Sequence, residues 1–435
     1  MNTDFDLDLD ALCADLPTFS WWLFVGCAKQ GRTHMHFEQV LQARLLDGRR
    51  KTHQPAGMRL ATDASDADAL RQRINRSYLA EWDDSTVRKR LYGVASAAIT
   101  GAFALIIDDT GIEKKGTKSP GVQRQYTGTA GKVTNCQIIV STHLASHDAS
   151  AALEMELYVP KSWCEDRERC RKAGIPDDIE FRTKPQMALA QVGRIVDAGV
   201  SASVVLADAG YGDNGDFRAG IAVKGLCYAV GVSNSMKVWR PAEGPNPPKP
   251  WSGQGRPPTQ QFPGEFQPVA IGQYAKELPD TSWHHIDLRP GAKNRRTSRF
   301  AAARVRTAHR ALAGRPPGGE EWLIIEWPAD EDAPSHYFLS NLPADTPIAE
   351  LAITAKLRWR VERDYQDGKQ EVGLDHYEGR GWTGFNHHLT ICMAAMTYLI
   401  ASQALFPPGN GAESRRRPPT APSPPAEPTR PLPAV

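Results

Sequence analysis

The chain has 435 residues, 41% of them hydrophobic and 23% charged, which is enough for two or three globular domains with buried cores. Its 52 Lys and Arg against 50 Asp and Glu give a net charge of +2, which excludes a global positive field. Any nucleic-acid contact must therefore come from local basic patches. Seven cysteines without a C-x-x-C pair argue against a structural zinc site and favour a reducing, cytoplasmic compartment.

Residues 1–95 are predicted to form an N-terminal helical domain. Apolar residues recur at every fourth position from 70 to 78 after an acidic start at residues 66–68, and residues 83–85 (Asp-Asp-Ser) can cap a second helix from Thr86. Basic clusters in this segment favour contact with DNA.

A second segment, residues 96–232, has the pattern of a mixed α/β sheet. Strands are expected at 102–107, 133–142, 153–159, 203–207 and 227–232, with helices at 185–200 and 213–223. That order is similar to the ribonuclease H-like fold. We expect the core to resume with C-terminal helices over 341–406, beginning with a strong helix at 348–370.

The interval between these two parts, residues 233–340, is predicted to be a β-rich insertion. Eight prolines fall in residues 241–264, which no helix or strand tolerates, whereas WLIIEW (322–327) and HYFLS (336–340) are typical of strands. Residues 407–435 contain ten prolines and an Arg triplet, and we expect a disordered tail. The apolar stretch 389–405 is predicted to be a buried core helix, not a membrane span.

Two aspartates directly follow apolar strand segments. Asp108 follows residues 102–107, and Asp208 follows 203–207. Ligands bind at the carboxyl ends of strands in open α/β sheets, and carboxylates there can share divalent metal ions. Aspartate also ends strands simply by starting turns. Whether Asp109, beside Asp108, also binds metal stays open.

A third carboxylate lies in the predicted helix at 348–370. Arg358 precedes Glu362 by four residues and Lys369 follows it by seven, which places the three side chains on one helical face. By spacing alone, a surface ladder of ion pairs is the favoured interpretation. The catalytic alternative gives Glu362 to a metal ion and the two cations to DNA phosphates.

The same segment resembles the YREK signature of bacterial DDE-type insertion-sequence transposases, in which Tyr, Arg, Glu and Lys are separated by two, three and six residues. Arg358, Glu362 and Lys369 match it, while Ala355 stands in the place of the Tyr. IIDDTGIEKKG and VLADAGYG are similar to the two aspartate blocks. QYTGTAGKVTNCQ, RDYQDGKQEVGLDHYEGRGW and GFNHHLT resemble those of insertion-sequence family 701 transposases, and the resemblance covers roughly residues 35–400.

The resemblance implies two-metal phosphoryl transfer on DNA by Asp108, Asp208 and Glu362. The expected cofactor is Mg²⁺, with Mn²⁺ as a substitute and two ions in the site, because hard cations prefer oxygen ligands. No G-x-S-x-G or Walker A sequence is present to suggest a different chemistry.

Basic residues outside this signature are candidates for DNA contact. Residues 288–319 hold nine Lys or Arg and no acid, a run that favours phosphate contact over a solvated loop. The candidates in this run are Arg295, Arg296, Arg299, Arg304 and Arg306. Lys114 and Lys115 lie in a glycine-rich loop that is either a phosphate-binding segment or a flexible hairpin. In related transposases a β insertion stacks a flipped base on Trp, and Trp239, Trp251 and Trp283 are equal candidates.

The leading hypothesis is a transposase that binds the terminal inverted repeats of its own element, cuts the strands and transfers them to a target. It would act on double-stranded DNA in the bacterial cytoplasm, at the nucleoid, as a homodimer that holds two ends and without a membrane partner. Two alternatives are a catalytically silent, transposase-derived DNA-binding regulator and a stand-alone ribonuclease H-like nuclease.

Overall fold

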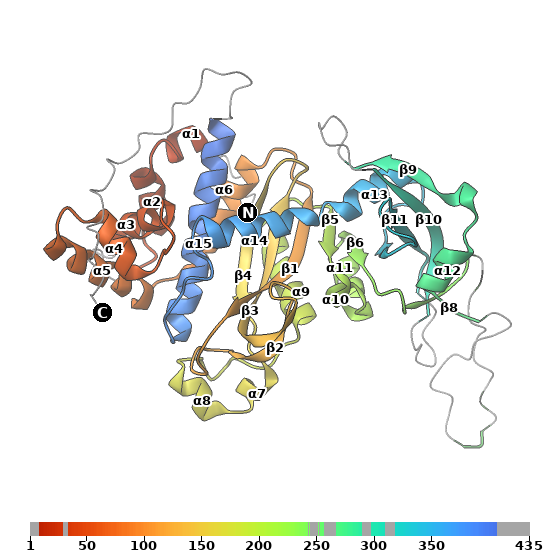
Figure 1. Ribbon diagram of the computed structural model, residues 1–435, viewed down its shortest axis with the longest axis horizontal. Helices are drawn as coiled ribbons and strands as arrows, with labels where there is room; N and C mark the ends of the chain where they lie inside the picture. Colours follow the sequence, from red (N-terminus) through yellow and green to blue (C-terminus); the bar gives the residue numbers. More distant parts are fainter. Residues whose placement is uncertain are drawn as a thin grey trace, which may run out of the picture.

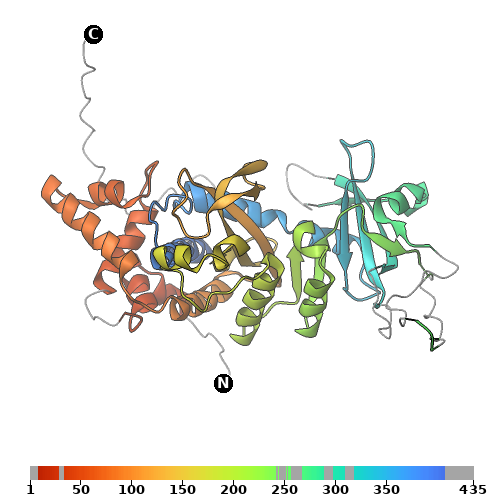
Figure 2. The same ribbon diagram turned by 90° about the horizontal axis from the view of Figure 1, so that it is seen from below.

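The computed structural model describes residues 8–28, 34–241, 243, 251, 253–255, 267–288, 297–308 and 318–406. These residues form an α/β protein with one mixed sheet and helices on both of its faces (Figures 1 and 2). The predicted tail at 407–435 and most of the proline-rich stretch 241–264 lie outside the described residues.

Twelve strands form the sheet in the described part of the chain, in the order β2-β3-β1-β5-β6-β12-β11-β10-β7-β8, with β4 beside β3 and β9 beside β10. They are β1 (Ala104–Glu113), β2 (Gln123–Thr127), β3 (Lys132–Ala145), β4 (Ser150–Leu157), β5 (Val204–Ala207), β6 (Cys227–Gly231), β7 (Lys237–Trp239), β8 (Val269–Ala270), β9 (His284–Asp287), β10 (Thr297–Thr307), β11 (Glu321–Pro328) and β12 (His336–Ser340). β1, β5 and β6 are parallel, whereas β3 is antiparallel to β1 and β12 is antiparallel to β6.

The helices separate into groups around this sheet. At one end of the molecule lie α1 (Leu9–Leu12), α2 (Leu16–Phe24), α3 (His34–Leu45), α4 (His53–Leu60), α5 (Ala64–Leu79) and α6 (Asp84–Ala98). α13 (Ile348–Lys356), α14 (Trp359–Gln370) and α15 (Trp382–Leu405) pack on one face, and α9 (Lys184–Asp197), α10 (Ala209–Gly212) and α11 (Gly215–Val223) on the other. α7 (Lys161–Cys164), α8 (Arg167–Lys172), α12 (Ile271–Glu277) and the short 3₁₀ helix Asp280–Ser282 complete the set.

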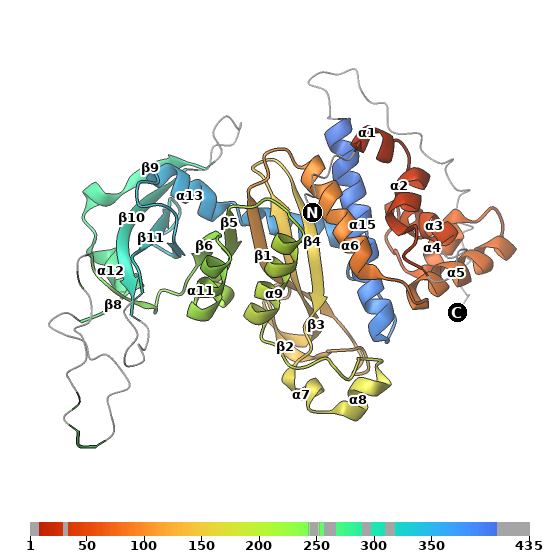
Figure 3. The same cartoon turned by 180° about the vertical axis from the view of Figure 1, so that it is seen from behind.

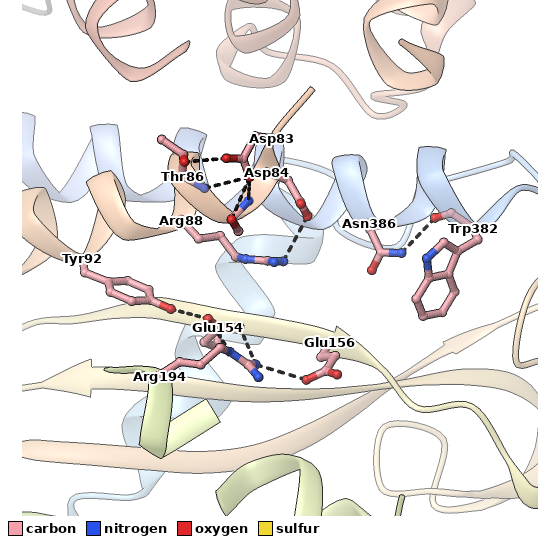
Figure 4. A network of polar contacts seen from close by, with 11 residues as sticks. Asp83, Asp84, Thr86, Arg88, Tyr92, Glu154, Glu156, Arg194, Trp382 and Asn386 are labelled. Carbon is pink, nitrogen blue, oxygen red and sulfur yellow. Dashed lines mark hydrogen bonds and ion pairs between the residues drawn. The ribbon is translucent and has the colours of Figure 1, made fainter. Parts of the chain in front are cut away.

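A buried polar network fixes α6 and α9 against the sheet (Figure 4). Glu154 of β4 is 2% exposed and accepts a hydrogen bond from the Tyr92 hydroxyl of α6. Arg194 of α9 lies 3.0 Å from a second Glu154 oxygen and 3.2 Å from Glu156. A buried carboxylate is tolerated when charge and hydrogen bonds compensate it, so this cluster stabilises the packing of the two helices.

The helices expected among residues 1–95 are present, with small shifts of boundary. Asp83 accepts hydrogen bonds from the backbone N–H groups of residues 85 and 86, so the predicted cap is confirmed and α6 begins at Asp84. α5 begins earlier than expected, because Asp63 and not the pair at 66–68 caps it. The division of the chain into domains remains a prediction.

Two details of the predicted core are wrong. Strand 102–107 continues to Glu113 because β3 pairs with its whole length, so Asp108 lies within β1 and not after it. The helix predicted at 348–370 is two helices that break at Leu357 and Arg358. The strands of the insertion, whose sheet the sequence did not assign, continue the core sheet, because β12 pairs with β6.

The apolar stretch 389–405 lies in α15, as a core helix. Among the described residues, α15 is the one helix whose length and composition would suffice to cross a membrane. It is nonetheless packed inside the protein between the N-terminal helices and the sheet, with Leu389, Ile391 and Met393 fully buried (Figure 3). The prediction of a core helix is confirmed.

Candidate active site

Asp108 lies within β1, and Asp208 directly follows the neighbouring parallel strand β5, as the N-cap of α10. β1 and β5 pair as far as Ile106 and Leu206. The same register, continued by two residues, places Asp108 beside Asp208. Because side chains alternate across a strand, the Asp108 carboxylate projects from the face of Ile106, and Asp208 is close enough to raise the pKa of Asp108. That face packs against the C-terminal helices, which include α14.

Both carboxylates are mostly buried. Burial raises the pKa of Asp108 from 3.8 to about 6, with Arg358 opposing the shift and the neighbouring Asp208 adding to it. Burial also raises the pKa of Asp208, again against the attraction of Arg358. Oδ1 of Asp208 has no hydrogen-bond partner among the described residues. Two adjacent buried carboxyl groups with raised pKa values lower the stability of the folded protein and favour the binding of a cation.

Arg358 connects Asp108 to Glu362. The backbone N–H of Leu357 donates to two carbonyls, which tightens the last turn of α13 and starts α14 immediately afterwards with Arg358 as its first flanking residue. Nη1 of Arg358 lies 2.7 Å from Oδ2 of Asp108, and Nη2 lies 2.9 Å from Oε1 of Glu362. Glu362 is 65% exposed, so its carboxylate faces open solvent at the mouth of the site.

Lys369 lies further along the same face of α14 and also contacts β1. Its Nζ donates to the hydroxyl of Thr110 at 2.8 Å, and Thr129 lies at 3.3 Å. Thr110 is two residues beyond Asp108, so it projects from the same face of the strand. Partial burial lowers the pKa of Lys369, against the attraction of Asp375. The structure therefore brings Arg358 to Asp108 and Lys369 to Thr110 on the same strand. Arg358, Glu362 and Lys369 lie on one face of α14, as the helical spacing predicted.

Asp109 projects from the opposite face of β1. Its Oδ2 lies 2.9 Å from Nζ of Lys184 on α9, and the Tyr211 hydroxyl donates to it at 3.3 Å. These contacts give Asp109 a structural role between the sheet and the helices of the far face. Its geometry does not favour a share in the ligand set of Asp108.

The residues of the site suit a divalent cation by their chemistry. Asp108 and Asp208 supply carboxylate oxygens, and Asp208 Oδ1 is a buried acceptor without a donor. In the described ranges no group of three or more His, Cys, Asp or Glu side chains is arranged to hold a metal ion. Glu362 instead joins the pair through the guanidinium of Arg358.

Comparison with known proteins decides the family. The sequence model of the DDE superfamily endonucleases matches residues 24–295, which is more than half of the chain. The chain belongs to the DDE superfamily endonucleases. A protein of Microchaete diplosiphon named "Probable transposase for insertion sequence element IS701" is 30% identical to this chain over 159 residues. That segment is 36% of this chain and spans 39% of the length of the relative.

The family match divides the candidate residues into two groups. Asp108 and Asp208 lie inside the matched residues 24–295, whereas Arg358, Glu362 and Lys369 lie beyond them. The last three are linked to the matched part by the contacts of Arg358 with Asp108 and of Lys369 with Thr110. The roles of all five residues remain a proposal.

Sequence analysis missed a buried network on the other side of α14. Asp364 lies 2.7 Å from Nδ1 of His143 and accepts a hydrogen bond from Ser150 at 2.7 Å. Ser141, the cross-strand neighbour of Asp108, contacts His143 at 2.8 Å and Tyr365 at 2.6 Å. The acid in VERDYQ two residues after Glu362 was a signal, because it had to face the sheet. The network holds α14 in place over the carboxylates.

The described arginines of the basic run lie on β10 and do not form one patch. Arg304 and Arg306 share a face of the strand, as predicted, and Arg299 lies on the other. Arg299 stacks over Trp327 at 3.8 Å and Arg304 over Trp322 at 5.0 Å, while Arg306 lies 3.6 Å from Glu320. Arg295 and Arg296 lie outside the described residues. DNA contact by this run stays a prediction.

The two lysines of the glycine-rich loop differ in their surroundings. Lys114 directly follows β1, and its Nζ donates to the carbonyl of Tyr377 at 2.5 Å. Partial burial lowers the pKa of Lys114. Lys115 is exposed. The loop carries β2, which pairs with β3 as a hairpin, so the hairpin alternative describes its backbone.

The three candidate tryptophans also differ. Trp239 is 6% exposed within β7 and belongs to the packed interior. Trp283 packs edge-on against Trp327 at 5.3 Å. Trp251 is 52% exposed. A role in base stacking is least compatible with the buried Trp239, and no contact distinguishes the other two.

Proposed function

We propose that this protein is a DNA transposase that binds the terminal inverted repeats of its insertion sequence, cleaves their strands with divalent metal and transfers them to a target. The observation that carries the proposal is that Asp108 and Asp208 lie side by side and that Arg358 links Glu362 to Asp108. The membership in the DDE superfamily endonucleases and the similarity to a transposase relative support it.

We also propose that the catalytic core is ribonuclease H-like. The order β4-β3-β1-β5-β6, with three antiparallel strands followed by two parallel ones, supports this assignment. Asp108 lies on the central strand β1, Asp208 directly follows its neighbour β5, and Glu362 lies on the C-terminal helix α14. The strands after β6 then serve as an insertion that lengthens the same sheet.

In this proposal each residue has a defined task. Asp108, Asp208 and Glu362 would hold Mg²⁺ or Mn²⁺, with two ions in the site, and the bound metal would supply activation of the attacking oxygen and stabilisation of the leaving oxygen. Arg358 orients Glu362 toward Asp108 through its two contacts. Lys369, steadied by Thr110, presents its ammonium to a DNA phosphate next to the carboxylates.

The partners follow from the same proposal. The substrates are the two double-stranded ends of the element and a target duplex in the bacterial cytoplasm. Two ends must be held together for their joint transfer, so we propose a homodimer in the complex with DNA. The cations of α14 and of β10 are the residues proposed to contact the backbone.

The experiment that tests the proposed function is a cleavage assay on DNA carrying the ends that flank the gene, with Mg²⁺. We expect cuts at the element ends with the wild type and none with Asp208→Ala. Asp216→Ala, an exposed aspartate at the start of α11, is a matched control that should cut normally. End binding without cutting would instead favour the regulator, and cutting without end preference the general nuclease.

A further inference from the structure

A cavity of about 430 Å³ lies between the N-terminal helices and the connection from α14 to α15, outside the proposed carboxylate site. Its walls come from α3, the first turn of α4, α5 and residues 376–381. The residues that give it its chemistry are Arg44, Arg71, Arg380, His53, His376 and Tyr78. The volume is within the range of small-molecule pockets.

The cavity is positively charged. Arg44 is 2% exposed and its Nε donates to the Tyr78 hydroxyl at 3.0 Å, with no carboxylate at ion-pair distance among the described residues. Arg380 is exposed and has no ion-pair partner in the same part of the chain. Glu378 is the single carboxylate among the described residues that line the cavity. Guanidinium groups in such a setting favour a phosphate, which they can bind in a bidentate manner.

One histidine of the cavity wall, His53, is affected by the same positive charges. The pKa of His53 is lowered to about 4, first by burial and then by Arg44 and Arg71. Arg71 is 39% exposed and pairs with Asp68 at 2.7 Å on the solvent side, so its charge is only partly compensated. Arg44, Arg71 and Arg380 carry like charges around the cavity, and an anion there would offset their mutual repulsion.

Flat rings line the same cavity. His53 lies against Tyr78 with ring centroids 4.6 Å apart, and Tyr377 lies 6.5 Å from Tyr78 in a stacked orientation. Nδ1 of His376 accepts a hydrogen bond from the backbone N–H of Lys51 at 3.1 Å, which fixes the ring. Imidazole and phenol rings are platforms on which bases stack. Rings and arginines together suit a base with its phosphate.

The cavity is connected to the carboxylate site along β1. Lys114 lies six residues beyond Asp108, about 20 Å at ~3.3 Å per residue, and its Nζ donates to the carbonyl of Tyr377 in the cavity wall. Lys369 contacts Thr110 between these two points. About 20 Å corresponds to roughly six base steps of B-form DNA, which is the length of strand that would separate the two sites.

We propose that this cavity binds one nucleotide unit of the DNA strand held by the enzyme, with its phosphate against Arg71 and Arg380 and its base against the rings of His53 and Tyr377. The proposal rests on the proposed function for the identity of the strand. The chemistry itself requires only a nucleotide, so a free nucleoside monophosphate is the other source of the same ligand.

The experiment uses the full chain without divalent cation, so that no strand is cut. The probe is a duplex of the element end that carries an unpaired 2-aminopurine nucleotide, followed by fluorescence and by anisotropy. We expect quenching with the wild type, and at least an about tenfold weaker affinity without quenching for Arg71→Gln/Arg380→Gln. Arg171→Gln/Lys172→Gln removes the same charge from the exposed α8 and should behave as the wild type.

Each outcome decides one point. Equal quenching and affinity in the two double variants would overturn the proposal. If Arg71→Gln/Arg380→Gln loses only the binding of free dAMP, the cavity takes a free nucleotide and the assignment to the DNA strand is wrong. If inorganic phosphate competes as well as dAMP, the base contact is wrong. If the wild type binds the probe through this cavity but does not cleave DNA when Mg²⁺ is supplied, the binding site remains supported and only the proposed function is contradicted.

Discussion

Two clusters of buried carboxylates lie on the same sheet and differ in how fully neighbouring groups compensate their charges. Glu154 receives a hydrogen bond from Tyr92 and an ion pair from Arg194, so every charge in its cluster is compensated (Figure 4). Asp108 and Asp208 lie side by side with Arg358 as their shared cation, and Asp208 Oδ1 has no partner in the described part of the chain.

The difference separates a structural cluster from a functional one. Compensated charges hold elements together, because each removed partner would leave a buried charge alone. Uncompensated carboxylates cost stability and are retained where a cation or a substrate completes them. The two clusters should therefore respond to substitution in opposite ways, in stability and in activity.

The largest effect is expected from the two neighbours Asp108 and Asp109. Asp108→Asn should lower cleavage at the element ends by roughly 10²–10³-fold or more, as the loss of one charge-stabilising group does in other active sites. Asp109→Asn should keep most of the activity, because its side chain contacts Lys184 on the other face. Equal losses in single-turnover cleavage assays of both variants would contradict the placement of the site.

A second prediction concerns pH and the metal-free protein. Because the pKa of Asp108 is raised from 3.8 to about 6, its favourable contribution is complete below pH 4 and is lost as the pH rises through 6. Asp108→Asn should therefore be more stable than the wild type at pH 7, by up to about 3 kcal/mol at ~1.36 kcal/mol per pKa unit.

The measurement is urea unfolding of both proteins in EDTA between pH 4 and pH 8. The advantage of Asp108→Asn should shrink toward zero at pH 4, where the carboxyl is protonated in the folded and the unfolded chain. A constant difference across this range would show that the carboxylate is not strained by burial.

The compensated cluster should behave in the reverse way. Glu154→Gln should destabilise the protein by about 1.5–3 kcal/mol, since it weakens hydrogen bonds to a charged group. Arg194 is 43% exposed and can be solvated, which keeps the cost at this level. Thermal unfolding gives the stability, and cleavage by the protein that remains folded should be unchanged. Loss of cleavage at full stability would give Glu154 a role that its contacts do not indicate.

The smallest effect is expected on β10. Arg304→Ala/Arg306→Ala should weaken DNA binding and reduce the slope of log K against log salt by at most about two units. The reduction should be less than two, because Arg304 stacks on Trp322 and Arg306 pairs with Glu320. Binding titrations from 50 to 200 mM salt measure it, and an unchanged slope would return this strand to a purely structural role.

Much of the core could be predicted from the sequence, because short apolar runs bounded by polar turns specify its strands. The register of Asp108 with Asp208 could not, since it depends on where the pairing of β1 with β5 ends. The extension of β1 to Glu113 depends on the partner strand β3, which lies far from it in the sequence. Pairing with a distant strand overrode the local signal that Asp108 ends a strand.

The candidate site was predicted as residue types and not as contacts. Helical spacing placed Arg358, Glu362 and Lys369 on one face, but the same spacing also fits a surface ladder of ion pairs. The contact of Arg358 with Asp108 distinguishes the two, and it depends on a helix break at Leu357 that the sequence does not signal. The network of Asp364 with His143 required the tertiary structure as well.

The most direct test of the contrast between the two clusters is a calorimetric titration of the full chain with Mn²⁺. The wild type and Glu154→Gln should bind the ion with similar affinity, whereas Asp108→Asn and Asp208→Asn should lose the binding. Unchanged binding in both aspartate variants, or a loss confined to Glu154→Gln, would contradict the assignment of Asp108 and Asp208 as the metal-binding pair.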